Sequence, residues 1–305
     1  MPGSKFELTV LGNNSAIPTA NRNPSAHLLN VNERFYLIDC GEGTQMQLRK
    51  YNFKMQRIGH IFISHLHGDH FFGLIGLLTT MNLLGREKPL TIHAHKELQE
   101  LIAMQLKTSG SWIDYAITYH DLPSGSEIIL DDGKIEVTTI PLKHRIPCCG
   151  FVFKEKQHPR KLLMGMVKNY DIPVSLLKGI KGGDDFTTRT GKLILNGELT
   201  APGPRSRSFA YVTDTRYKAD IVPLITAVDL LYHEATFTEE HKERAKKTFH
   251  CTAKQAGNIA KQANVGKLLL GHYSVRYKSL DLLLDEAKTE FENAILSEQG
   301  ETYTV

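Results

Sequence analysis

The chain lacks the cysteine content of a disulfide-bonded protein. Its four cysteines, at positions 40, 148, 149 and 251, form no Cys-x-x-Cys pair, so we expect reduced thiols and assign them no function. No apolar stretch approaches eighteen residues, and the first residues lack the pattern of a signal peptide. We therefore expect neither export nor membrane insertion, and predict a cytoplasmic protein.

A large net charge is also absent, because 37 Lys and Arg nearly balance 33 Asp and Glu. The small positive surplus is localised: residues 154–207 hold eleven Lys or Arg and five Asp or Glu. Scattered glycines and prolines and weak apolar periodicity in this segment predict an inserted flexible arm. Localised positive charge favours a polyanionic partner, and a solvated basic face is the alternative.

Length and composition suit one large α/β domain or two ordinary ones. Short apolar runs predict strands at 6–11, 27–31, 35–39, 58–63, 90–94, 135–140, 151–153, 208–212, 230–232 and 267–270. Helical patterns occur at 44–51, 70–84, 96–109, 219–226, 253–263 and 279–292. Two β-rich halves, each with its own helices, predict two sheets packed face to face with helices outside.

Residues 65–70 read His-Leu-His-Gly-Asp-His and directly follow the predicted strand 58–63. Such a cluster of imidazoles and a carboxylate is hard to explain without a metal, whereas a single histidine near a strand end is usually a surface or core residue. In an extended loop His65 and His67 point the same way, while Asp69 and His70 begin a helix and can face a second position. The spacing therefore makes two neighbouring metal ions plausible.

Three further residues that follow predicted strands can complete such a centre, namely His144, Asp214 and His272. Taken singly, such an aspartate is more often a turn residue or helix cap, and such a histidine is more often a hydrogen-bonded surface group. Together with the loop at 65–70 they supply the roughly seven ligands, with a bridging carboxylate, that two zinc-type ions need. Imidazole and carboxylate ligands also suit other divalent ions.

Three other histidines are interpreted as structural. His93 and His95 alternate along one predicted strand, and no carboxylate accompanies them. His60 lies inside an apolar strand, where a core or supporting position is expected.

The histidine loop resembles the hallmark of the metallo-β-lactamase superfamily, which implies a four-layer αβ/βα sandwich. The resemblance covers residues 1–305 as a single domain, with 154–207 as the inserted arm. A narrower resemblance to the ribonuclease Z family runs through most of the chain. It is carried, in order, by PTANRN (18–23), DCGEGTQ (39–45), HRIP (144–147), DTR (214–216), HEAT (233–236), HCT (250–252) and GHYSVRY (271–277).

This resemblance implies two Zn²⁺ ions per subunit. By position, the ligands divide into His65, His67 and His144 for one ion, Asp69, His70 and His272 for the other, and Asp214 as the bridge. Two cations beside a phosphodiester neutralise its oxygens and activate water for attack on phosphorus. The superfamily motif alone does not fix a substrate.

The resemblance also implies three catalytic roles. Asp69 orients the attacking water and accepts its proton as general base. His250 is the candidate proton donor for the leaving ribose 3′ oxygen, and Glu234 orients His250 and raises its pKa. The alternative for Glu234 is that it caps the helix that follows.

Ribonuclease Z matures tRNA 3′ ends, so the expected substrate is precursor tRNA. The expected products are a tRNA ending in a 3′-hydroxyl and a trailer with a 5′-phosphate. Residues 154–207 then correspond to the family's arm, which binds the tRNA elbow through backbone charge and shape. A homodimer is implied, in which the arm of one subunit serves the active site of the other.

Two other functions are compatible with parts of the sequence. A superfamily hydrolase of small esters or phosphodiesters would need no basic arm, so deleting residues 160–200 would separate it from a tRNA-processing enzyme. A non-catalytic tRNA-binding protein would have a damaged metal site, whereas all seven ligands are present. RNA-processing relatives such as ribonuclease J add a large helical module, for which 305 residues leave no room.

Overall fold

The computed structural model describes residues 5–305, which divide into two compact units. The main unit contains the residues up to Lys154 together with Arg207–Val305. The inserted unit is Glu155–Ser206. No helix in the described part of the chain has the length and apolar character needed to cross a membrane.

The first sheet of the main unit has seven strands in the order β18-β1-β2-β3-β4-β5-β6. Their bounds are β1 Phe6–Gly12, β2 Ala26–Val31, β3 Arg34–Ile38, β4 Ile58–Phe62, β5 Leu90–His93, β6 Ile117–His120 and β18 Thr302–Thr304. Pairing is antiparallel from β18 to β3 and parallel from β3 to β6.

The second sheet also has seven strands, in the order β17-β16-β15-β14-β9-β8-β7. Their bounds are β7 Ile128–Asp131, β8 Ile135–Pro141, β9 Cys149–Glu155, β14 Ser208–Val212, β15 Leu230–Glu234, β16 Lys267–Gly271 and β17 Ala294–Leu296. Strands β14 to β17 are parallel, so their carboxyl ends meet at one edge.

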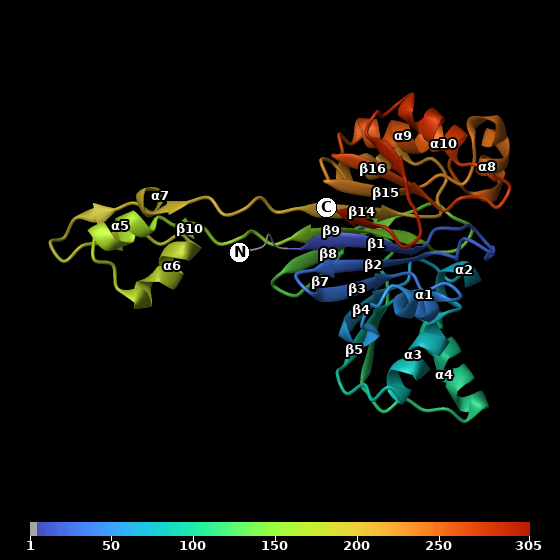
Figure 1. The fold of residues 1–305 in the computed structure, drawn as a ribbon, viewed down its shortest axis with the longest axis horizontal. Helices are drawn as coiled ribbons and strands as arrows, with labels where there is room; N and C mark the ends of the chain where they lie inside the picture. Colours follow the sequence, from blue (N-terminus) through green and yellow to red (C-terminus); the bar gives the residue numbers. More distant parts are fainter. Residues whose placement is uncertain (1–4) are drawn as a thin grey trace. The chain divides into compact units, whose positions relative to one another are not determined.

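Alternating side chains divide the core of the main unit into three apolar layers. Phe6, Leu8 and Val10 of β1 pack with Phe151 and Phe209 between the sheets. On the outer face of the first sheet lie α1 (Thr44–Lys50), α3 (Leu74–Leu83) and α4 (Glu97–Ser109), and on that of the second lie α9 (Ala253–Gln262) and α10 (Asp281–Lys288) (Figure 1). This is the αβ/βα sandwich that the sequence predicts.

The predicted helix 70–84 is wrong as a single element, because α2 (Gly68–Phe71) ends before α3 begins at Leu74. The break lies at Gly73, whose amide donates to the Cys40 carbonyl over 2.9 Å. A Cβ at Gly73 would lie 2.1 Å from the Gly41 carbonyl oxygen, so only glycine allows this approach. The predicted helix 219–226 is a 3₁₀ helix, η3, at Ala219–Leu224.

Three more short helices belong to the main unit, namely η1 Met55–Arg57, η4 Glu239–His241 and α8 Lys242–Thr248. The predicted strands of the main unit are all present, but β6, β7, β17 and β18 were not predicted. All four cysteines are free and buried.

The inserted unit has short regular elements and a small apolar core. The elements are β10 Lys161–Leu162, α5 Met164–Asn169, η2 Val174–Leu176, α6 Leu177–Gly182, β11 Phe186–Thr187, β12 Leu193–Ile194, α7 Asn196–Leu199 and β13 Thr200–Ala201. Six buried side chains form its core: Val167, Ile172, Ile180, Phe186, Ile194 and Leu199. Its role as a flexible tRNA-binding arm stays a prediction.

Candidate metal centre

The seven predicted ligands all follow strands of the main unit. The loop at 65–70 comes after β4 of the first sheet. His144, Asp214 and His272 come after β8, β14 and β16 of the second sheet. The structure brings these side chains together although up to 207 positions separate them along the chain, from His65 to His272.

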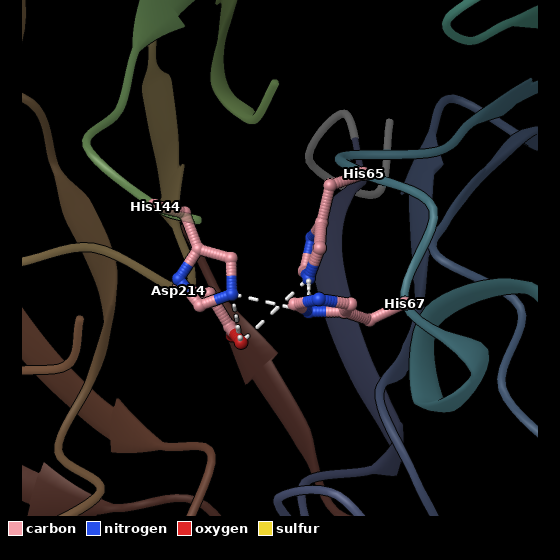
Figure 2. Close-up of side chains that lie close together, drawn as sticks. All are labelled: His65, His67, His144 and Asp214. Carbon is pink, nitrogen blue, oxygen red and sulfur yellow. Dashed lines mark hydrogen bonds and ion pairs between the residues drawn. The ribbon is translucent and has the colours of Figure 1, made fainter. Parts of the chain in front are cut away.

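His65, His67, His144 and Asp214 form one group, in which each residue offers a ligand atom within 4.8 Å of the others (Figure 2). The Nδ1 of His67 lies 3.1 Å from the Nε2 of His65 and 3.1 Å from the Nε2 of His144. The Asp214 Oδ2 lies 3.7 Å from each of those two Nε2 atoms. Three ring nitrogens thus face one another around one carboxylate oxygen.

Asp69, His70 and His272 form a second group. The Asp69 Oδ2 lies 3.5 Å from the Nε2 of His70 and 3.5 Å from the Nε2 of His272. The other oxygen of Asp214, Oδ1, lies 3.5 Å from the Nε2 of His70 and 3.1 Å from the Nε2 of His272. Asp214 therefore presents one oxygen to each group, which is the arrangement of a bridging ligand.

The donor set fits divalent metal ions. Nitrogen ligands about 2.0–2.1 Å from a tetrahedral zinc ion lie about 3.3 Å from one another, which matches the spacing in the first group. In the second group the Nε2 atoms of His70 and His272 are buried and have no hydrogen-bond partner among the described residues. Buried polar atoms are rarely left unpaired, so a cation accounts for both observations.

Charge and burial set the protonation of three of these side chains, two histidines of the first group and Asp214, in the form that binds a cation. Burial lowers the pKa of His65 well below its usual value and that of His144 to about 4, so both rings are neutral with free lone pairs. Burial alone would raise the pKa of Asp214, but the neighbouring histidines, His272 and His70 foremost, hold it well below its usual value. Asp214 is therefore ionised.

Hydrogen bonds fix the orientation of four of the five candidate ligand imidazoles through the nitrogen that faces away from each group. The Nδ1 of His70 lies 2.7 Å from Asp39 Oδ2, and the Nδ1 of His65 lies 3.0 Å from Ser64 Oγ. For the other two rings, His144 Nδ1 donates to the Phe249 carbonyl over 3.1 Å, and His272 Nδ1 lies 3.0 Å from Thr236 Oγ1.

Asp39 contacts the candidate site, although the sequence analysis gave it no role. It is fully buried after β3 and accepts hydrogen bonds from the Ser64 amide and hydroxyl and from the Tyr211 hydroxyl, at 2.8, 3.0 and 2.7 Å. Its signals in the sequence are a carboxylate at the end of the predicted strand 35–39 and its place in the segment 39–45 that carries the resemblance. The contact with Tyr211, which comes from the other sheet, is visible only in the fold.

His250 and Glu234 lie beside the first group as a hydrogen-bonded pair. The Nδ1 of His250 lies 3.0 Å from Glu234 Oε1, and its Nε2 lies 4.0 Å from Asp214 Oδ2. Burial would lower the pKa of His250, but the charges of Glu234 and Asp214 raise it to about 9. Asp214, His250 and His272 are also close enough to form a third potential ligand group.

The helix-capping interpretation of Glu234 is wrong. Glu234 is the last residue of β15, fully buried, and it also accepts hydrogen bonds from the Thr215 amide and the Thr236 hydroxyl. The helix that follows, η4, starts after Thr238 and receives no side-chain cap.

A cleft of about 450 Å³ opens over the two groups. Its lining includes His67, Asp69, His144, Asp214 and His250. The half-exposed Ile17 and the exposed ring of Phe72 also line it. The cleft gives a substrate access to both groups and to His250 at once.

His60 and His93 form a separate aromatic row. Their ring nitrogens lie 3.3 Å apart, and His93 stacks on Phe62 and on His120. Within residues 5–305 neither they nor His95 join a group of three or more side chains that could hold a metal ion.

The chain is similar to proteins of known family and to solved structures. A family model described as Anti-Pycsar protein Apyc1 matches residues 6–158. A curated protein from Phocaeicola vulgatus named Ribonuclease Z is 47% identical over 97% of this chain and 96% of its own length. The crystal structure of human tRNase Z, short form, matches with a TM-score of 0.72 and 28% identity, covering 97% of this chain and 98% of that one. The metallo-β-lactamase fold protein YhfI from Bacillus subtilis matches with a TM-score of 0.70 and 21% identity, over 99% and 100% of the two chains.

Proposed function

The chain belongs to the ribonuclease Z family, and on this premise we propose that it removes the 3′ trailer from precursor tRNA by zinc-dependent hydrolysis. It is a metal-dependent endoribonuclease of the metallo-β-lactamase superfamily. The proposed products are a tRNA ending in a 3′-hydroxyl and a trailer carrying a 5′-phosphate.

The observation that carries this proposal is the position of the Asp214 carboxylate, which presents one oxygen to each of the two groups. We assign His65, His67 and His144 to one zinc ion, Asp69, His70 and His272 to the other, and Asp214 to both. When bound, two such ions would neutralise charge on the phosphodiester oxygens. They would also lower the pKa of water, so that hydroxide is available near neutral pH. Other divalent ions suit the same ligands.

Three side chains complete the proposed chemistry. Asp69, whose Oδ2 is held by the Ala16 amide over 2.8 Å, orients the attacking water and accepts its proton. On the leaving side, His250 donates a proton to the ribose 3′ oxygen as the bond from that oxygen to phosphorus breaks. Glu234 keeps the Nδ1 proton of His250 hydrogen-bonded, so that Nε2 faces the cleft.

The metal centre recognises a phosphodiester but not a tRNA, so selection of the substrate needs another surface. We assign this role to the inserted unit, which forms the larger part of the basic segment 154–207. Exposed lysines there meet backbone phosphates of the tRNA elbow, and shape supplies the specificity. We further propose a cytoplasmic homodimer in which the arm of one subunit serves the site of the other.

The test is incubation of the purified protein with a 3′-extended precursor tRNA, followed by mapping of both new ends. We expect one cut, a 3′-hydroxyl on the tRNA and a 5′-phosphate on the trailer. A 3′-phosphate on the tRNA would contradict the assignment of the leaving oxygen. Elemental analysis of the active protein should give two zinc ions per chain, and chelation should abolish cleavage until zinc is restored.

A further inference from the structure

A second cavity lies next to the metal cleft and shares His250 with it. This basic pocket, of about 270 Å³, is lined by Arg216, Tyr217, Lys242, Glu243, Lys246, His250 and Gln255. His250 also lines the metal cleft. The metal cleft and the basic pocket are therefore neighbours on either side of one shared side chain.

Arg216 is held in place by its surroundings rather than by an acidic partner. Its Nε donates to the Lys246 carbonyl over 2.8 Å, and its guanidinium lies 3.7 Å from the centre of the Phe249 ring. Its two terminal nitrogens have no partner among the described residues. A guanidinium fixed in this way loses little side-chain entropy when it binds an anion.

The charge balance of the pocket is positive. Lys246 is exposed and forms no ion pair within residues 5–305, while Lys242 is paired with Glu239 at 2.5 Å. Glu243 is the one acidic residue of the lining, against three cations. A stacked, forked guanidinium and a neighbouring ammonium suit an anion with several acceptor oxygens, such as the phosphate of an RNA backbone.

We propose that Arg216 and Lys246 bind a backbone phosphate on the 5′ side of the scissile bond, in the part of the RNA that becomes the mature tRNA. This inference rests on the proposed function, in which His250 lies beside the leaving 3′ oxygen. That oxygen belongs to the mature tRNA, so RNA beyond His250 is mature tRNA. The trailer then lies on the other side of the cleft, near Phe72 and Ile17.

The test compares Lys246→Ala with Lys247→Ala, a neighbour on α8 that does not line the pocket. For each protein we measure KM and kcat on 3′-extended precursor tRNA, and the inhibition constants of the two products. Lys246→Ala should raise KM, and the inhibition constant of mature tRNA, about fivefold, as expected for one lost charge-assisted contact. The inhibition constant of the trailer should change less than twofold, and Lys247→Ala should behave as the parent.

A neutral methylphosphonate placed on the 5′ side of the scissile bond gives a second measure. It should weaken binding to the parent protein at least as much as Lys246→Ala does, because it removes the charge that both Arg216 and Lys246 meet. Combined with Lys246→Ala, it should weaken binding no further than the methylphosphonate does alone. Arg216→Lys, which keeps the charge but not the fork, should lie between the parent and Lys246→Ala.

Three results would each overturn the assignment. The first is a larger change in the inhibition constant of the trailer than in that of mature tRNA. The others are additive losses of affinity from Lys246→Ala and the methylphosphonate, and equal changes in KM for Lys246→Ala and Lys247→Ala. The proposed function fails by a separate result, namely absence of cleavage or a 3′-phosphate product with the parent protein. The two failures are therefore distinguishable.

Discussion

The metal centre and the inserted unit hold their charged side chains in opposite ways. At the metal centre Asp214, Glu234 and Asp39 are buried, and each has several polar neighbours at short range. In the inserted unit the basic residues are mostly exposed, on a framework with only six buried apolar side chains. Loss of one member of a buried network leaves its partners without hydrogen bonds, so the effect is large. Exposed charges are screened by water and salt, and each contributes a small, separate amount to binding. Chemistry and substrate selection should therefore be separable by mutation.

The strongest test of this contrast is Asp214→Ala, because one carboxylate serves both histidine groups. We expect kcat on precursor tRNA to fall on the order of 10⁴-fold, with loss of bound metal. Cleavage assays and elemental analysis check this. Full turnover by the variant would remove the bridging role and the proposed mechanism with it.

His250→Ala should be the next most damaging change. Loss of a proton donor costs about 10²- to 10⁴-fold in kcat. The predicted ligands are all still present, so the metal content should equal that of the parent protein. A variant that also loses metal would instead place His250 among the ligands, in the third group with Asp214 and His272.

Asp39→Asn tests whether the buried network extends beyond the ligands. The change weakens the hydrogen bond that orients His70, and such supporting partners are worth about 10- to 100-fold in metal affinity or activity. Competition with a chelator measures the affinity. The control is Ser124→Ala, which removes a hydroxyl group from an exposed residue outside this network.

Glu234→Gln should change the pH profile more clearly than the maximal rate. The charge of Glu234 raises the pKa of His250, so its removal lowers that pKa. As the proposed proton donor, His250 must be protonated to act, so activity should fall as pH rises through its pKa. The alkaline limb of the kcat profile should therefore move to lower pH, with a roughly tenfold loss in kcat at neutral pH. If the alkaline limb of the kcat profile stays at the same pH, Glu234 has only a structural role.

The smallest effect is expected in the inserted unit. Lys178→Gln combined with Lys181→Gln should raise KM for precursor tRNA about fivefold and lower the salt slope of binding by about one to two units. The matched control is the pair Lys178→Arg and Lys181→Arg, which keeps both charges. Equal KM values for the double Gln variant and the double Arg variant would mean that these lysines form a solvated basic face that does not bind tRNA.

The candidate ligands that the fold brings together could be picked out from the sequence because their signals are local. Four of them lie in one hexapeptide, and His144, Asp214 and His272 each follow a run that reads as a strand. The two-sheet fold was predictable for the same reason, since alternation along β1 marks which side chains face the other sheet.

Other features depend on contacts between distant segments, which no local pattern reveals. The break between α2 and α3 follows from the approach of Gly73 to Gly41, and the core of the inserted unit joins residues as far apart as Val167 and Leu199. Strand β18 has only three residues and is recognisable only beside β1. The part played by Asp39 depends on Tyr211, 172 positions away.

The hydrogen bond from Tyr211 to Asp39 joins the two halves of the sandwich directly behind His70. A small slip of one sheet over the other would be transmitted through this bond and turn the imidazole. Heating should then weaken metal binding at this centre while most of the secondary structure is still intact. At high temperature, activity would then be lost through a shift of one sheet against the other, before the protein unfolds.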